Sequence, residues 1–162
     1  MKDIFIDNNV AKNFATPIDK HYKDLIAWIN EFDQDLVENN PHLISNYAQL
    51  IVSQKLLKEY LSSSYNSSKI NAIPMIINRL TREGRLKKIS KTEIDCFISD
   101  NFSKTVKRNL KSNVEDHCHI VVVLLSVRKL CLTYDKNLSI DLTNFPGHTV
   151  SVKKRPEELI YR

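Results

Sequence analysis

The chain of 162 residues lacks several features that common protein classes require. Only two glycines are present, Gly84 and Gly147, so the chain can form neither the Gly-rich loop of P-loop proteins nor the Rossmann fingerprint. The three cysteines, Cys96, Cys118 and Cys131, are an odd number without paired spacing. This pattern argues against a disulfide framework and favours a reducing environment.

Long hydrophobic runs are also missing. The longest apolar run, 120–125, is too short to cross a bilayer, and acidic residues interrupt the N-terminal apolar stretch, unlike in a signal peptide. We therefore expect a soluble, cytoplasmic protein with no membrane partner. Hydrophobic residues make up 42% of the chain and charged residues 27%, as in ordinary globular proteins, so we expect residues 1–162 to form a single domain.

The net charge of +5 is unevenly distributed along the chain. Residues 79–111 hold ten basic and four acidic residues, which is more than the whole positive excess. A basic block of this kind favours binding to a polyanion through counterion release. A solvated helix face is the alternative explanation, but like charges on one helical stripe repel unless a partner neutralises them. The residues that we expect to contact nucleic acid are Lys104, Lys107, Arg108 and Lys111, which form such a stripe, with Arg82 and Arg85.

Short apolar runs alternate with amphipathic segments along the chain. The runs predict strands at 4–6, 50–52, 130–133 and 149–152. The helical patterns cover 19–38, 54–62, 74–82, 92–98, 114–130 and 138–142, and the polar segment 62–68 is predicted to be a loop. This alternation predicts a single three-layer α/β domain. Its central sheet of four to five strands is mostly parallel, with helices on both faces.

Four acidic residues fall near the predicted ends of strands or the starts of helices. Asp7 follows the first strand, Glu59 lies in the helix after the second strand, Asp116 opens the most apolar helix, and Asp135 follows the third predicted strand. Each alone has a structural explanation as a helix cap, a turn residue or a solvated helix face. Ligands of open parallel sheets bind beyond the carboxyl ends of the strands, so the joint placement predicts one site.

These segments resemble the motifs of PIN-domain nucleases from the first strand to the last. Phe5-Ile6-Asp7-Asn8-Asn9-Val10 looks like the opening strand of that family, and Ser53 with residues 56–61 is similar to its glutamate-bearing helix. Residues 115–120 resemble the segment in which an aspartate opens a core helix. Residues 132–138 resemble the T-x-D segment, and 152–159 the last strand with its Pro-Glu tail.

The resemblance implies a metal-dependent endoribonuclease. On this basis Asp7, Glu59, Asp116 and Asp135 would hold Mg²⁺ or Mn²⁺ and form the catalytic set, while Asn9 and Thr133 would orient water or a carboxylate beside the metal. The chemistry agrees, because close carboxylates repel one another and a divalent cation reverses the sign of that interaction. The implied partners are RNA and, if the protein is the toxin of a toxin–antitoxin pair, an antitoxin protein. A homodimer is also implied.

Three other interpretations remain open. The resemblance also permits a catalytically dormant module that binds RNA or protein. The run His117-Cys118-His119 suggests a zinc site, although adjacent helical residues point in different directions. The segment 7–11 partly matches the D-x-D motif of haloacid-dehalogenase-like phosphatases, but Asn9 stands where that motif needs its second aspartate.

Overall fold

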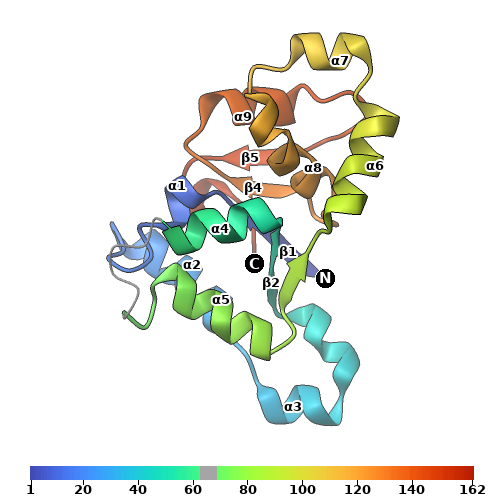
Figure 1. Cartoon of the computed structure of the whole chain (residues 1–162). Helices are drawn as coiled ribbons and strands as arrows, with labels where there is room; N and C mark the ends of the chain where they lie inside the picture. Colours follow the sequence, from blue (N-terminus) through green and yellow to red (C-terminus); the bar gives the residue numbers. More distant parts are fainter. Residues whose placement is uncertain (63–68) are drawn as a thin grey trace.

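The computed structural model describes residues 1–62 and 69–162 and contains one sheet of five parallel strands (Figure 1). Part of the predicted polar loop, 63–68, lies outside the described residues. The strand order is β3-β2-β1-β4-β5. The strands are β1 (Lys2–Ile6), β2 (Ala48–Val52), β3 (Leu86–Lys88), β4 (Leu130–Leu132) and β5 (Ser151–Lys153).

Helices connect the strands and flank the sheet. They are α1 (Asn8–Ala11), α2 (Lys20–Asn30), α3 (Gln34–Asn39), α4 (Gln54–Ser62), α5 (Ile73–Arg82), α6 (Lys91–Asn101), α7 (Lys104–Asn109), α8 (His117–Leu125) and α9 (Lys136–Thr143). Short 3₁₀ turns are η1 (Pro41–Asn46), η2 (Val114–Asp116) and η3 (Pro156–Glu158). The predicted fold class, a three-layer α/β domain around a parallel sheet, is confirmed.

The core forms around β1 and β2, whose hydrophobic side chains are fully or almost fully buried. Parallel strands that are covered on both faces have continuously apolar sequences, as the segments 4–6 and 50–52 do. Helix α8 contacts β1 and β2 and lies beside α6 and α9, while α2 contacts β2. The all-round hydrophobicity of α8 follows from this central position, with His119 and 120–123 buried.

Strand β3 is absent from the sequence prediction. It spans three residues, Leu86–Lys88, at the edge of the sheet, and only Leu86 carries an apolar side chain. Its backbone pairs with β2 in register from Leu50↔Leu86 to Val52↔Lys88. The strand is therefore defined by pairing to its neighbour and has no hydrophobic pattern that could reveal it.

The helix predicted at 19–38 is two helices. Glu31 takes an extended conformation, and the Asp33 side chain caps α3 by accepting a hydrogen bond from the Leu36 N–H at 2.9 Å. Phe32 lies between the two helices, and the centre of its ring is 4.8 Å from the Arg85 guanidinium carbon. An internal capping residue and a distant aromatic contact thus outweigh the continuous helical pattern.

The core helix predicted at 114–130 is shorter, because it begins as a 3₁₀ turn and ends at Leu125. The buried carboxylate of Asp3 accepts hydrogen bonds from the N–H groups of Val127 (2.8 Å) and Arg128 (2.9 Å). Ser126 Oγ accepts another from the Lys129 N–H at 3.0 Å. These side chains satisfy the backbone outside a helix, so the helix stops and β4 can begin.

Candidate functional site at the switch point of the sheet

The chain changes direction across the sheet between β1 and β4. After β1 it adds β2 and β3 on one side, and it then returns to add β4 and β5 on the other. In parallel α/β sheets the crevice for a ligand lies at such a switch point, beyond the carboxyl ends of the two strands. Here those ends carry Asp7, directly after β1, and Thr133, directly after β4.

Asp7 is fixed by residues of the two adjoining strand ends. Its carboxylate accepts hydrogen bonds from the Thr133 hydroxyl and, at 2.7 Å, from the Asn9 side-chain amide. The Asn9 side-chain oxygen also accepts from the Tyr134 N–H at 3.0 Å. Asn9 and Thr133 therefore both contact a predicted metal-binding carboxylate, and together they hold the two strand ends in one position.

The Asp7 carboxyl group is almost completely buried, with an exposed fraction of 8%. Burial raises its pKa, and the nearby negative charge of Glu59 acts in the same direction. The hydrogen bond from Thr133 and the positive charge of His119 act against this rise without cancelling it. Burial thus disfavours the ionised form of Asp7, and an additional nearby cation would stabilise that form.

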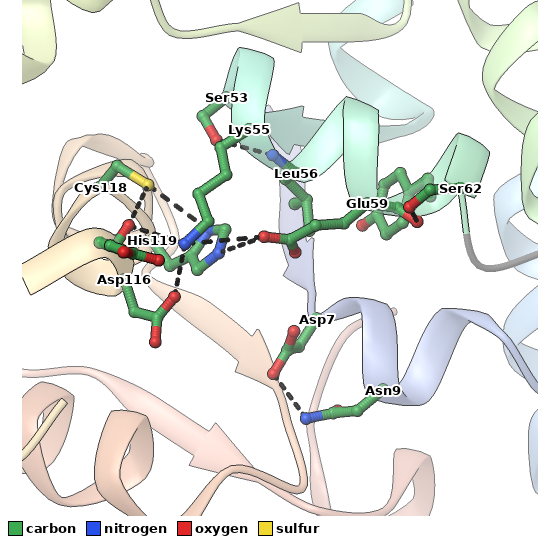
Figure 2. A network of polar contacts seen from close by, with 12 residues as sticks. Asp7, Asn9, Ser53, Lys55, Leu56, Glu59, Ser62, Asp116, Cys118 and His119 are labelled. Atoms are coloured by element: carbon green, nitrogen blue, oxygen red, sulfur yellow. Dashed lines mark hydrogen bonds and ion pairs between the residues drawn. The ribbon is translucent and has the colours of Figure 1, made fainter. Parts of the chain in front are cut away.

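Glu59 reaches the same region from α4. The Ser53 hydroxyl accepts a hydrogen bond from the Leu56 N–H at 3.1 Å, which starts the helix where the sequence predicted and sets the position of Glu59. A Glu59 carboxylate oxygen lies 3.3 Å from Nε2 of His119 in α8, as Figure 2 shows. Burial lowers the pKa of His119, but its contacts with Cys118 and Glu59 raise it overall, to about 10.

Asp116 is paired with a lysine from α4. The Lys55 Nζ atom lies 2.6 Å from Asp116 Oδ1 and 3.8 Å from Glu59 Oε1 (Figure 2). It also donates a hydrogen bond to the Glu115 carbonyl at 2.8 Å. Asp116 is the residue before α8 but makes no side-chain capping bond, so helix capping does not explain its placement.

Asp135 differs from the other three acids. It is exposed and caps α9 by accepting hydrogen bonds from the N–H groups of Asn137 (2.7 Å) and Leu138 (3.0 Å). Its own N–H donates to Thr133 Oγ1 at 2.9 Å. Helix capping therefore explains the position of Asp135. The Thr133 hydroxyl also links Asp135 to Asp7, because it accepts from the Asp135 N–H and donates to the Asp7 carboxylate.

The donor chemistry of the four acids fits a hard divalent cation, because Mg²⁺ and Mn²⁺ prefer carboxylate oxygens. Their side chains are not arranged around a common metal position in this structure. Within the described ranges, no group of three or more His, Cys, Asp or Glu side chains is placed to hold a metal ion. Lys55 and His119 instead contact the oxygens of Glu59 and Asp116. Figure 2 shows the carboxyl groups of Asp7, Glu59 and Asp116 around these two basic side chains.

The basic stripe is only partly helical. Lys104, Lys107 and Arg108 lie on α7, which ends at Asn109, while Lys111 follows it, and all four are exposed. Helix α7 and the second half of α9 line one small cavity. Since Asp135 caps the first turn of α9, this helix runs from the basic segment to Asp135. Arg82 is exposed on α5, which Figure 1 shows apart from α7, beyond α4 in the lower half of the view.

Arg85 is not available to nucleic acid, and its prediction as a contact residue is wrong. Its side chain is fully buried and donates hydrogen bonds to the carbonyls of Ile29 (2.8 Å) and Ala48 (2.9 Å). It also pairs with Glu83. These contacts offset the cost of burying the guanidinium charge. Arg85 thereby joins α2, β2 and the end of α5, which is a structural role.

The sequence prediction missed Lys55 and did not assign His119 to the acidic site. Lys55 precedes Glu59 by one helical turn, a spacing that pairs side chains on one helix face. His119 follows Asp116 by three residues and therefore points the same way. Its neighbour His117 packs against Phe102 with ring centroids 5.5 Å apart, so the two histidines of the suggested zinc run diverge.

In residues 1–62 and 69–162, no helix combines the length and the apolar character needed to cross a membrane. Comparison with known proteins gives no match to a protein-family model, a curated protein or a solved structure.

Proposed function

We propose that the protein is a metal-dependent nuclease that hydrolyses phosphodiester bonds in RNA. The observation that carries this proposal is the position of Asp7. It lies at the switch point of a parallel sheet, connected to Asp135 through Thr133 and facing Glu59 and Asp116. Pockets at this point of α/β sheets bind ligands, and a cluster of acids there suits a divalent cation.

The proposed roles follow from the contacts. Asp7, Glu59, Asp116 and Asp135 would hold Mg²⁺ or Mn²⁺. When bound, the cation would lower the pKa of a water molecule and neutralise charge on the phosphate. Thr133 and Asn9 fix the orientation of the Asp7 carboxylate by hydrogen bonds. His119 places positive charge beside Glu59 and restricts its position.

The basic residues Lys104, Lys107, Arg108 and Lys111 supply the proposed contact with the RNA backbone. Exposed lysine and arginine side chains bind phosphates without regard to sequence. Because α7 borders α9 and Asp135 caps the start of α9, a strand bound along these helices would lead to the acidic site. This part of the proposal rests on charge and placement.

The test is cleavage of an end-labelled single-stranded RNA by the purified protein. We expect cleavage with Mn²⁺ or Mg²⁺, none with EDTA, and recovery when excess Mn²⁺ is added. The variant Asp7→Asn is expected to be inactive under all conditions while remaining folded. Equal cleavage in EDTA, or by Asp7→Asn, would contradict the proposal.

A second candidate is a catalytically dormant module of the same fold that binds RNA. The pairing of Lys55 with Asp116 and Glu59 favours it, since those carboxylates are already neutralised in part. The same assay separates the candidates when RNA binding is measured in parallel. Metal-independent binding without cleavage supports the dormant module, and metal-dependent cleavage supports the nuclease.

A further inference from the structure

We propose that Lys55 is a built-in counter-ion of the acidic site, competing with the divalent cation for Glu59 and Asp116. This inference rests on the proposed function and concerns how tightly the site binds its metal. It assigns to Lys55 a role in setting metal affinity. The expected consequence is a site that loads only when the divalent cation is abundant enough to displace the lysine.

The contacts of Lys55 place its charge on two candidate metal-binding carboxylates. Its ammonium group lies 2.6 Å from Asp116 Oδ1 and 3.8 Å from Glu59 Oε1. These carboxylates come from two different segments, α4 and the start of α8, so Lys55 links the two sides of the site. A carboxylate oxygen that accepts a short hydrogen bond from an ammonium group is less available to a metal ion.

The side chain of Lys55 is able to leave this position. Its exposed fraction is 34%, and a lysine side chain has four rotatable carbon–carbon bonds, so the ammonium group is held by its contacts with Asp116, Glu59 and the Glu115 carbonyl. A rotation toward solvent would free Asp116 and Glu59 without any movement of the helices. The charge balance of the site is then restored only if another cation takes the place of the ammonium group.

Lys58 provides a matched control on the same helix. It lies three residues after Lys55 in α4 and is exposed, so Lys58→Met removes the same charge from the same helix and leaves the Lys55–Asp116 ion pair in place. Comparison of Lys55→Met with Lys58→Met therefore separates the local contact from the change in net charge. Lys55→Arg keeps a cation at the site and serves as a second control.

The experiment is a Mn²⁺ titration of each protein, followed by calorimetry or by the electron paramagnetic resonance signal of free Mn²⁺. We expect Lys55→Met to bind Mn²⁺ about threefold to fivefold more tightly than the wild type, as expected for removal of one partly exposed ion pair. Lys58→Met should stay within about twofold of the wild type, and Lys55→Arg should not bind more tightly. Unchanged or weaker binding by Lys55→Met would overturn the inference.

RNA cleavage in the same samples distinguishes the two proposals. If Lys55→Met binds Mn²⁺ no more tightly, while the wild type binds the ion and cleaves RNA, only the inference fails. If neither protein binds Mn²⁺, the inference and the metal-dependent function fail together. Should Lys55→Met not fold, side-chain NMR of the wild type decides: Mg²⁺ should shift the Lys55 ε-methylene signal and leave that of Lys58 unchanged. An unshifted Lys55 signal at saturating Mg²⁺ would overturn the inference.

Discussion

At the level of one residue, the buried carboxylate of Asp7 lowers the stability of the folded protein. Its carboxyl group is buried, and burial raises its pKa above the ordinary value. In the pH range between the unfolded and the folded pKa, the native protein keeps a proton that the unfolded chain has released. Stability therefore falls as pH rises through this range, and the loss persists above it.

Replacement of Asp7 by asparagine should accordingly raise the melting temperature at pH 7 in EDTA. An amide keeps a hydrogen-bond acceptor for Thr133 without a buried charge. The advantage should shrink as the pH is lowered toward about 4, where the wild-type carboxyl group also becomes neutral. Thermal unfolding at both pH values measures this. A melting temperature equal to or below that of the wild type at pH 7 would show that ionised Asp7 is not unfavourable.

Individual residues also show what the sequence could predict about the site. The positions of Asp7, Glu59, Asp116 and Asp135 relative to strands and helices follow from local patterns, whereas their service as one metal site stays a prediction. Lys55 and His119 were missed as site residues because their partners, Asp116 and Glu59 respectively, lie 61 and 60 residues away in the chain. Arg85 was misassigned for a similar reason, since its acceptors at Ile29 and Ala48 become visible only in the fold.

At the level of elements, the position of the basic segment depends on one buried carboxylate in α9. Asp141 has an exposed fraction of 3% and accepts hydrogen bonds from the N–H groups of Lys111 and Ser112, both at 2.7 Å. These bonds hold the chain between α7 and η2 against α9. They also place Lys111, a predicted RNA contact, beside the helix that Asp135 caps.

We therefore expect Asp141→Ala to lower the free energy of unfolding by about 2 kcal/mol, because two part-buried N–H groups lose their acceptors. Urea denaturation measures the change. The control is Asp100→Ala, which removes an exposed carboxylate from α6 and should change stability by less than about 0.5 kcal/mol. A loss for Asp141→Ala no larger than that of the control would mean that the two N–H groups are satisfied by water.

Elements with strong local signals were predicted well, and those defined by distant contacts were not. Helix α4 spans 54–62 as predicted, because a capping serine and an amphipathic pattern agree there. The central strands β1 and β2 were found from their apolar runs. Strand β3 and the end of α8 were missed because they depend on pairing to β2 and on Asp3, respectively, which no local pattern reveals.

At the level of the whole molecule, the four candidate acids and the exposed basic stripe lie in two different regions. The acids lie at the switch point of the sheet, while Lys104, Lys107, Arg108 and Lys111 lie on and directly after α7. An RNA held by both regions would contact the lysines and arginine through its phosphates. This division predicts that RNA affinity and RNA cleavage can be changed separately.

Reversal of three charges on α7, by Lys104→Glu, Lys107→Glu and Arg108→Glu together, should weaken RNA binding at least about tenfold at 0.1 M salt. The slope of log affinity against log salt should also become shallower by about 2, since three phosphate contacts are lost. Fluorescence anisotropy at several salt concentrations measures both. The control is Lys20→Glu, Lys23→Glu and Lys69→Glu together, which changes the net charge by the same amount at exposed residues outside the predicted contacts and should weaken binding clearly less. Equal losses in both proteins would indicate that only net charge matters.

The central claim is that four separated acids serve one hydrolytic site. The most direct measurement is the rate of Mn²⁺-dependent RNA cleavage by Asp7→Asn, Glu59→Gln, Asp116→Asn and Asp135→Asn, with Asp100→Asn as the control. We predict that each of the four lowers the rate at least about 100-fold, as expected for loss of a metal-binding group, and that the control cleaves like the wild type. Cleavage at the wild-type rate by the Asp7 or Asp135 variant would contradict the account.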